Sequence, residues 1–271
     1  MASYKVRIGN VEVLSLSDNT PEFPAANVFP KVSESDWKKY PDALTVEKKL
    51  KTNFGCFLAR SQGKTILVDT GIGAGFPGRL MADMRDKGVN PMDVSIVAFT
   101  HLHSDHIGWC VAQEAGKSKL LFPNAKYWVP EGDWDHYTKA DVLANSPAVK
   151  SQVLPLKDLG ALKLIEGGAA LTSEITSVST PGHTPGHTSY AISSGGEKGF
   201  ILGDVFNFPF QVSETAWEIA FDFDKALGRK TREAILDRLE KDKATVGAGH
   251  LLPPSLGKIV RTGSRRYWQG L

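Results

Sequence analysis

Short apolar runs separated by turn-forming residues recur along the chain, a pattern typical of β-strands. A first series of strands is expected at residues 6–16, 54–58, 65–68 and 94–99. A second series is expected at residues 126–129, 162–165, 175–179, 189–192 and 200–202. Glycine and proline residues punctuate both series, so the sequence predicts two sets of strands.

Helical spacing of apolar residues is confined to two longer segments. Residues 77–87 have Pro77 near the start and Gly88 past the end, as expected of a helix. Residues 230–241 also carry an apolar face. After the first helix, we expect helix to return only in this segment. Two series of strands, each followed by a helix, predict two packed sheets covered outside by helices, which is an α/β sandwich.

A long irregular segment at residues 17–52 interrupts the first series of strands. It contains four prolines, and a short helix is expected at residues 33–39 with Ser33 as its N-cap. An insertion of this length in a compact domain usually covers a site or makes an oligomer contact. We therefore expect one domain over residues 1–271, with the insertion as a lid or a dimer contact.

Composition is that of an ordinary globular protein, with 41% apolar and 23% charged residues in 271. The net charge of +2 is too small to indicate a nucleic-acid partner, and Arg261, Arg265 and Arg266 are expected on a solvated tail. The N-terminal segment has no apolar run of signal-peptide length, and no later segment suggests a membrane partner, so a cytoplasmic protein is expected. Cys56 and Cys110 are expected as buried free thiols.

The strongest chemical signal is the hexapeptide HLHSDH at residues 101–106, where an apolar strand ends. His101 and His103 are spaced so that two imidazoles can face one ion, while Asp105 and His106 can serve a neighbouring ion. Imidazole and carboxylate are the usual nitrogen and oxygen ligands of zinc and related metals. A mere run of exposed histidines is a poor alternative, because four potential ligands occupy six positions directly after an apolar strand.

The remaining ligands are expected at three places where an apolar strand again runs into a polar loop. These supply His183 after residues 175–179, Asp204 after residues 200–202, and His250 after Thr245-Val246. Of the seven histidines, His136 alone lies outside these motifs and is interpreted as an ordinary surface or loop residue. Such a concentration is expected of a metal site.

Taken in order, HxHxDH, PGHTPGH, GD and GxH resemble the motifs of the metallo-β-lactamase-fold hydrolase superfamily, and VDTGIG at residues 68–73 resembles its early Asp-Thr-Gly turn. The resemblance spans roughly residues 54–250. It implies an αββα sandwich with the metals at one sheet edge. Within the superfamily, the segments around residues 180–212 look most like methyl parathion hydrolase and N-acyl-homoserine-lactone lactonases, and the resemblance also implies a homodimer through the insertion.

The same resemblance implies two divalent metal ions, with zinc first and manganese, cobalt or iron as alternatives. One ion would take His101, His103 and His183. The other would take Asp105, His106 and His250, and Asp204 would bridge both. A carboxylate is the side chain that can span two ions about 3.5–4 Å apart.

Several neighbouring residues are given supporting roles. Asp69 is expected to orient a ligand histidine, and His187 is expected to pack or orient rather than to bind metal. At least two of five aromatic residues are expected to line an apolar substrate pocket, the five being Trp109, Phe206, Phe208, Phe210 and Trp217. Asn207 is assigned to the same pocket, at a position where lactonases of this group often carry tyrosine.

The predicted reaction is attack of a metal-bridging hydroxide on a small-molecule ester or lactone, with phosphotriesters as promiscuous substrates. Asp105 is expected to hold metal and to accept a hydrogen bond from the nucleophile. A β-lactamase and a glyoxalase II-like thioesterase remain alternatives, although neither an export leader nor a basic glutathione-binding module is evident. A non-hydrolytic redox metal protein is the alternative of another class, although no flavodoxin-like segment follows the last motif.

Overall fold

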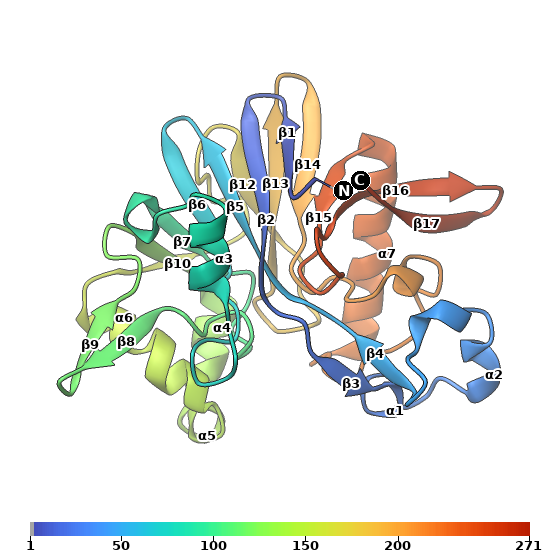
Figure 1. Cartoon of the computed structure of the whole chain (residues 1–271), viewed down its shortest axis with the longest axis horizontal. Helices are drawn as coiled ribbons and strands as arrows, with labels where there is room; N and C mark the ends of the chain where they lie inside the picture. Colours follow the sequence, from blue (N-terminus) through green and yellow to red (C-terminus); the bar gives the residue numbers. More distant parts are fainter. Residues whose placement is uncertain (1–2) are drawn as a thin grey trace.

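Two β-sheets form the body of the computed structural model, which describes residues 3–271 (Figure 1). The first sheet has seven strands in the order β1-β2-β5-β6-β7-β10-β11. Their bounds are β1 (Lys5–Ile8), β2 (Val11–Asn19), β5 (Phe54–Ser61), β6 (Lys64–Val68), β7 (Ile96–Ala98), β10 (Lys126–Pro130) and β11 (Leu162–Ile165). The second sheet has six strands in sequence order. They are β12 (Ile175–Ser179), β13 (Thr188–Ser194), β14 (Glu197–Ile201), β15 (Thr245–Gly247), β16 (Leu256–Thr262) and β17 (Arg265–Gly270).

Two short ribbons and a set of mostly short helices complete the fold. The ribbons pair β3 (Glu22–Pro24) with β4 (Lys49–Lys51), and β8 (Val111–Glu114) with β9 (Lys117–Leu120). The α-helices are α1 (Ala25–Val28), α2 (Glu34–Trp37), α3 (Leu80–Asp86), α4 (Glu131–Tyr137), α5 (Ala140–Ala144), α6 (Pro155–Asp158) and α7 (Lys225–Asp242). Single turns are η1 (Pro41–Ala43), η2 (Pro91–Asp93), η3 (Val149–Val153) and η4 (Pro209–Val212).

The alternation of side chains along each strand separates three apolar layers. In β5, Phe57 joins the core between the sheets, whereas Leu58 joins the outer core with α3. In β14, Ile201 faces the other sheet and Phe200 packs under α7. Both outer faces are therefore covered by helices, and the predicted αββα sandwich is confirmed.

Several element predictions need correction. Residues 6–16 form a hairpin and not one strand, because Gly9 takes a positive φ of 57° in the turn between β1 and β2. Helix returns well before residue 225, since α4, α5 and α6 follow β10, and their short apolar faces give only weak periodicity. The arginine tail is the β16–β17 hairpin, in which Arg261 and Arg266 pair with Glu240.

The insertion at residues 17–52 is tied to the body of the protein by an aromatic cluster. Ser33 caps α2 as predicted, through a reciprocal bond with Asp36. Apolar residues of the insertion pack against the segment that follows Asp204, and this cluster contains Ala25, Val28, Phe29, Leu50, Phe208, Phe210, Trp217 and Ile219. The insertion is thereby held beside the loop that carries Asp204.

Two further expectations can be compared with the described part of the chain. Cys56 and Cys110 are both buried and free. Among residues 3–271, no helix combines the length and the apolar character that crossing a membrane needs.

Candidate metal centre

Polar loops converge at one edge of the sandwich because of the strand directions. β6 and β7 are parallel, so Asp69 and His101 leave the first sheet at the same edge. β14 and β15 are also parallel, and Asp204 and His250 leave the second sheet together. Carboxyl ends of parallel strands are where open α/β sheets place their ligands. A hydrogen bond from the backbone N–H of Thr188 to the carbonyl of Thr100 joins the two sheets beside this edge, at 2.8 Å.

Asp69 organises the loop that carries HLHSDH. Its φ of 63° lies in the left-handed region, a strained conformation for a residue with a side chain. In this conformation its carboxylate accepts hydrogen bonds from the N–H and the hydroxyl of Thr100, at 2.7 and 2.8 Å. It also accepts the Nδ1–H of His106 at 2.9 Å. The strain is therefore compensated by bonds that fix two ends of the motif loop.

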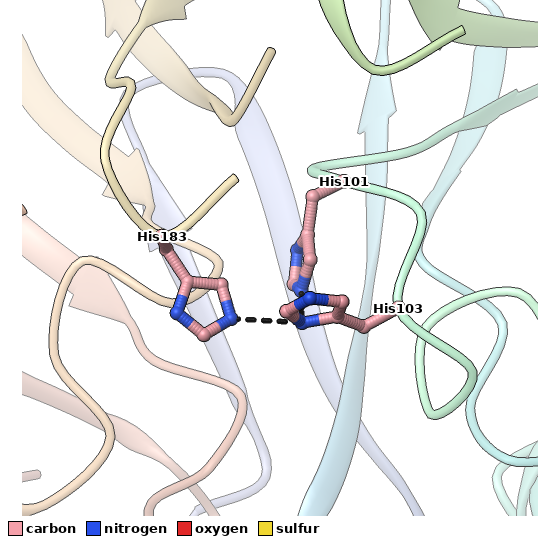
Figure 2. A group of neighbouring side chains, drawn as sticks. All are labelled: His101, His103 and His183. Atoms are coloured by element: carbon pink, nitrogen blue, oxygen red, sulfur yellow. Dashed lines mark hydrogen bonds between the residues drawn. The ribbon is translucent and has the colours of Figure 1, made fainter. Parts of the chain in front are cut away.

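Three histidines from two sheets face one another in a first group (Figure 2). Nε2 of His101 lies 3.1 Å from Nδ1 of His103, which lies 2.9 Å from Nε2 of His183. His101 directs its Nδ1 to the hydroxyl of Thr100, and His183 directs its Nδ1 to Asp222. The outer nitrogens of His101 and His183 are therefore engaged, and the inner nitrogens of the three rings lie close together.

A second group consists of Asp105, His106 and His250. Nε2 of His106 and Nε2 of His250 lie 3.4 Å apart, and Asp105 Oδ2 lies 3.8 and 3.6 Å from these two atoms. Nδ1 of His250 donates to the carbonyl of Asn53 at the end of the insertion, at 2.8 Å. This arrangement again leaves Nε2 of both histidines free to bind a ligand.

Asp204 lies between the two groups. Its Oδ2 is 3.2 Å from Nε2 of His183 and 2.9 Å from Nε2 of His250, and its Oδ1 is 3.3 Å from Nε2 of His106. His101, His106 and Asp204 also form a third set of mutually close ligand atoms. All seven residues expected as ligands are thus brought together around one carboxylate.

The donor set fits divalent cations. Oδ1 of Asp204 is buried and accepts no hydrogen bond within the described residues, which is costly for a carboxylate unless a cation compensates it. Burial tends to lower the pKa of His106, but the carboxylates of Asp204, Asp69 and Asp105 outweigh it and raise that pKa to about 10. The pKa of His250 is likewise raised against burial by Asp204. The site therefore calls for positive charge near Asp204, which is what a divalent ion supplies.

Burial has the larger effect on the pKa of two other histidines of the site. Burial lowers the pKa of His103 to about 3 and holds that of His101 well below its usual range. Both are therefore neutral near pH 7, the form in which imidazole binds metal.

His187 supports the centre without joining either ligand group. Its Nε2 accepts the backbone N–H of Asp204 at 2.9 Å, and its Nδ1 donates to the carbonyl of Thr180 at 3.0 Å. Burial lowers the pKa of His187 to about 3, in keeping with a neutral ring. His136 lies on α4, with its ring 5.0 Å from that of Phe223.

Two buried carboxylates that the sequence did not single out hold the loops in place. Asp222 joins His183 to Arg232 of α7, at 2.8 and 3.3 Å. Asp133 of α4 accepts hydrogen bonds from the N–H of Leu102, the hydroxyl of Thr184 and the N–H of Gly186. Neither lies in one of the ligand motifs, and each has other acidic residues beside it, so no signal in the sequence distinguished it.

A cavity of about 570 Å³ opens over the metal groups. Its walls come from the insertion, the motif loops, the loop before α3 and the segment after Asp204. The lining residues outside the ligand groups are Asn19, Pro21, Phe23, Val28, Thr52, Phe54, Ile72, Phe76, Ser104, Asn207, Phe208, Ile219 and Phe221. Aromatic and aliphatic side chains thus dominate the walls.

Only some of the residues that were predicted to line a substrate pocket lie in the wall of this cavity. Asn207 and Phe208 line the cavity, whereas Trp109, Phe206 and Trp217 do not. The indole N–H of Trp109 donates to Asp18 beneath the loop before α3, Phe206 is buried under α7, and Trp217 lies in the cluster that holds the insertion. Phe210 belongs to that cluster and lines a separate cavity. Proximity in sequence to the ligand loops did not distinguish aromatic residues that pack in the core from those that line the cavity. The sequence analysis did not identify four lining residues, which are Phe23, Phe54, Phe76 and Phe221.

The fold resembles that of several solved hydrolases. A structure of the hydrolase AbOPH of the beta lactamase superfamily matches with a TM-score of 0.89 at 24% identity, covering 100% of this chain and 97% of that one. AidC, a dizinc quorum-quenching lactonase solved with a product, matches with a TM-score of 0.83 at 24% identity, covering 98% and 96%. A probable metal-dependent hydrolase from Staphylococcus aureus matches with a TM-score of 0.77 at 22% identity, covering 90% and 91%.

The sequence itself carries the family assignment. No match was found among curated proteins. The family model of the metallo-beta-lactamase superfamily matches residues 56–250, which span HLHSDH, His183, Asp204 and His250. This agrees with the resemblance inferred from the motifs. The chain therefore belongs to the metallo-beta-lactamase superfamily of metal-dependent hydrolases.

Proposed function

We propose that the protein is a dinuclear metal hydrolase that cleaves uncharged esters or lactones, with phosphotriesters as additional substrates. The observation that carries this proposal is the position of Asp204 between two groups of three ligand atoms, directly below an apolar cavity. His101, His103 and His183 would hold one ion, and Asp105, His106 and His250 the other. Zinc is the first choice for such nitrogen and oxygen donors. When bound, the two ions lower the pKa of water toward neutrality and act as Lewis acids toward a carbonyl or phosphoryl oxygen.

The chain's own residues would prepare the site for this chemistry. Thr100, Asp222 and the carbonyl of Asn53 hold the outer nitrogens of the ligand histidines and so fix their tautomers and ring orientations. Asp105 is partly exposed to the cavity, and its carboxylate can accept a hydrogen bond from a nucleophilic water or pass a proton to a leaving group. The aromatic walls exclude water and bind an apolar acyl or aryl substituent.

The charge of the cavity favours uncharged substrates. Among the described residues that line it there is no lysine or arginine, and its acidic members are Asp105 and Asp204. β-Lactams and glutathione thioesters carry carboxylates, which proteins usually bind with basic side chains. A neutral ester, lactone or phosphotriester needs no such partner, and AidC, which has a similar fold, is a lactonase.

A substrate panel with metal-loaded protein tests the proposal. The panel contains an aryl ester, an N-acyl homoserine lactone and paraoxon, together with nitrocefin and a glutathione thioester. We expect hydrolysis of at least one of the three uncharged substrates and its loss upon chelation. Efficient turnover of only nitrocefin or the thioester would redirect the assignment to the anionic class.

The insertion at residues 17–52 is proposed as a fixed wall of the substrate site. It contributes Phe23 and Val28 to the cavity, and Thr52 and Asn53 connect its end to His250. Deletion of this segment is therefore expected to affect substrate binding and the His250 loop together.

A further inference from the structure

Asn207 lies three residues after Asp204 and turns its side chain toward that carboxylate. Its Nδ2 donates a hydrogen bond to Oδ2 of Asp204 at 2.7 Å. The reverse amide orientation would set two acceptor oxygens 2.7 Å apart, so the nitrogen is the atom that faces Asp204. At this position, where lactonases of the group often carry tyrosine, the structure shows an amide in contact with Asp204, the residue between the two groups.

The backbone around Asn207 is held in place independently. Oε1 of the buried Gln211 accepts the N–H of Asn207 at 2.8 Å and the N–H of Phe208 at 3.1 Å. These bonds fix the loop that follows Asp204, so the amide of Asn207 approaches the carboxylate from a defined direction. The direction does not depend on a bound substrate.

The carboxylate needs such a partner because its terminal torsion is intrinsically soft. Oδ1 of Asp204 accepts no hydrogen bond within residues 3–271, while Oδ2 is close to His183 and His250. Outside the histidines of the metal groups, Asn207 is the only described side chain that donates to this carboxylate. Without the amide of Asn207, only the histidines would restrain the rotation of the Asp204 carboxylate.

We propose that Asn207 is a positioning residue for metal binding, which fixes the carboxylate of Asp204 between the two ligand groups. The assignment rests on the proposed metal binding at this site. It differs from a substrate-binding role because the amide N–H is engaged with Asp204, while Oδ1 is buried and has no hydrogen-bond partner among the described residues. Loss of the amide N–H is therefore expected to weaken metal binding even when no substrate is present.

Zinc affinity, measured by competition with a chromophoric chelator in the absence of substrate, tests the assignment. Asn207→Leu removes the donor at similar volume, whereas Asn207→Gln keeps an amide that can reach Asp204 across the adjoining cavity. Asn19→Leu is the matched control, because Asn19 lines the same cavity but, among residues 3–271, its Oδ1 accepts only the N–H of Thr20, at 2.7 Å. We expect a loss of about tenfold or more for Asn207→Leu, a loss within about threefold for Asn207→Gln, and parental zinc affinity for Asn19→Leu.

Kinetics with the best substrate of the panel provide a second readout. Asn207→Leu is expected to lower kcat while KM changes by less than about threefold, because the amide N–H acts on Asp204 and not on the substrate. Parental zinc affinity combined with a raised KM would overturn the assignment, and so would equal zinc losses for the leucine and glutamine variants. If Asn207→Leu gives no folded protein by circular dichroism, Asn207→Ala replaces it in the same comparison. A parent protein that binds no zinc would instead refute the proposed function.

Discussion

Nδ1 of His183 donates to Oδ1 of Asp222 at 2.8 Å, and Oδ2 of the same carboxylate lies 3.3 Å from the guanidinium of Arg232. Arg232 also donates to the carbonyls of Val205 and Thr215. α7 is thus connected to His183 through one buried ion pair, and to the loop after Asp204 through the other hydrogen bonds of Arg232. The long C-terminal helix has a direct part in fixing the site, in addition to covering the second sheet.

Replacing Asp222 by alanine is expected to affect metal binding and stability together. The outer nitrogen of His183 loses its acceptor, which typically lowers metal affinity by about 10- to 100-fold. Arg232 becomes a buried charge without its carboxylate, which costs on the order of 3 kcal/mol. Zinc titration and chemical denaturation measure the two effects.

Asp224→Ala is the matched control for this change. The carboxylate of Asp224 caps α7 by accepting the N–H of Leu227, and the hydrogen bond of its backbone N–H to the carbonyl of Gly182 does not depend on the side chain. Its loss is expected to cost about 1 kcal/mol of stability and to leave zinc affinity unchanged. Equal zinc affinity in the Asp222 and Asp224 variants would contradict the orienting role of Asp222.

Two exposed phenylalanines near the cavity allow a test of the substrate site. Phe221 is 53% exposed and lines the cavity, whereas Phe223 is 63% exposed and packs its ring against His136 instead. We expect Phe221→Ala to raise KM for aryl or long-chain acyl substrates several-fold, with kcat less affected, because apolar contact area is lost. Phe223→Ala is expected to leave KM within about twofold of the parent protein. Equal effects of the two variants would contradict the assigned wall.

Fold class could be predicted from the sequence because strand alternation and ligand motifs follow local rules. The seven expected ligands are brought together because each follows the end of a strand. Six follow strands of the parallel pairs β6–β7 and β14–β15, and His183 follows β12, which runs in the same direction as β14 because both pair antiparallel with β13. Asp133 and Asp222 could not be identified in this way, because each acts through contacts to residues distant in sequence. The lining of the cavity was only partly predicted for the same reason: Phe206 is close to Asp204 in sequence but packs against α7, whereas Phe221 is more distant in sequence and lines the cavity.

The C-terminal hairpin is expected to be sensitive to acid. Hydrogen bonds from Arg261 and Arg266 lower the pKa of Glu240 to about 2. A carboxyl whose pKa is lowered by folding stabilises the native state above its unfolded value, near 4.5, and loses that contribution as the pH falls toward 2. Glu240→Gln is therefore expected to lower Tm at pH 7 by a small amount, because ion pairs near the surface contribute about 1 kcal/mol or less.

The same comparison near pH 3 supplies the control. There the parent protein has lost part of the contribution of Glu240, so the difference in Tm between parent and Glu240→Gln should shrink. A difference that stays constant or grows between pH 7 and pH 3 would show that the ionised carboxylate is not what stabilises the hairpin.

Metal stoichiometry, measured together with hydrolysis, tests the central claim most directly. Protein stripped with a chelator and then titrated with zinc should bind two ions per chain, and hydrolysis of the uncharged substrate should rise with the second equivalent. Elemental analysis of the dialysed protein and initial rates at each equivalent provide the two curves. Full hydrolysis by metal-free protein, or saturation of binding and activity at one ion per chain, would contradict the dinuclear account.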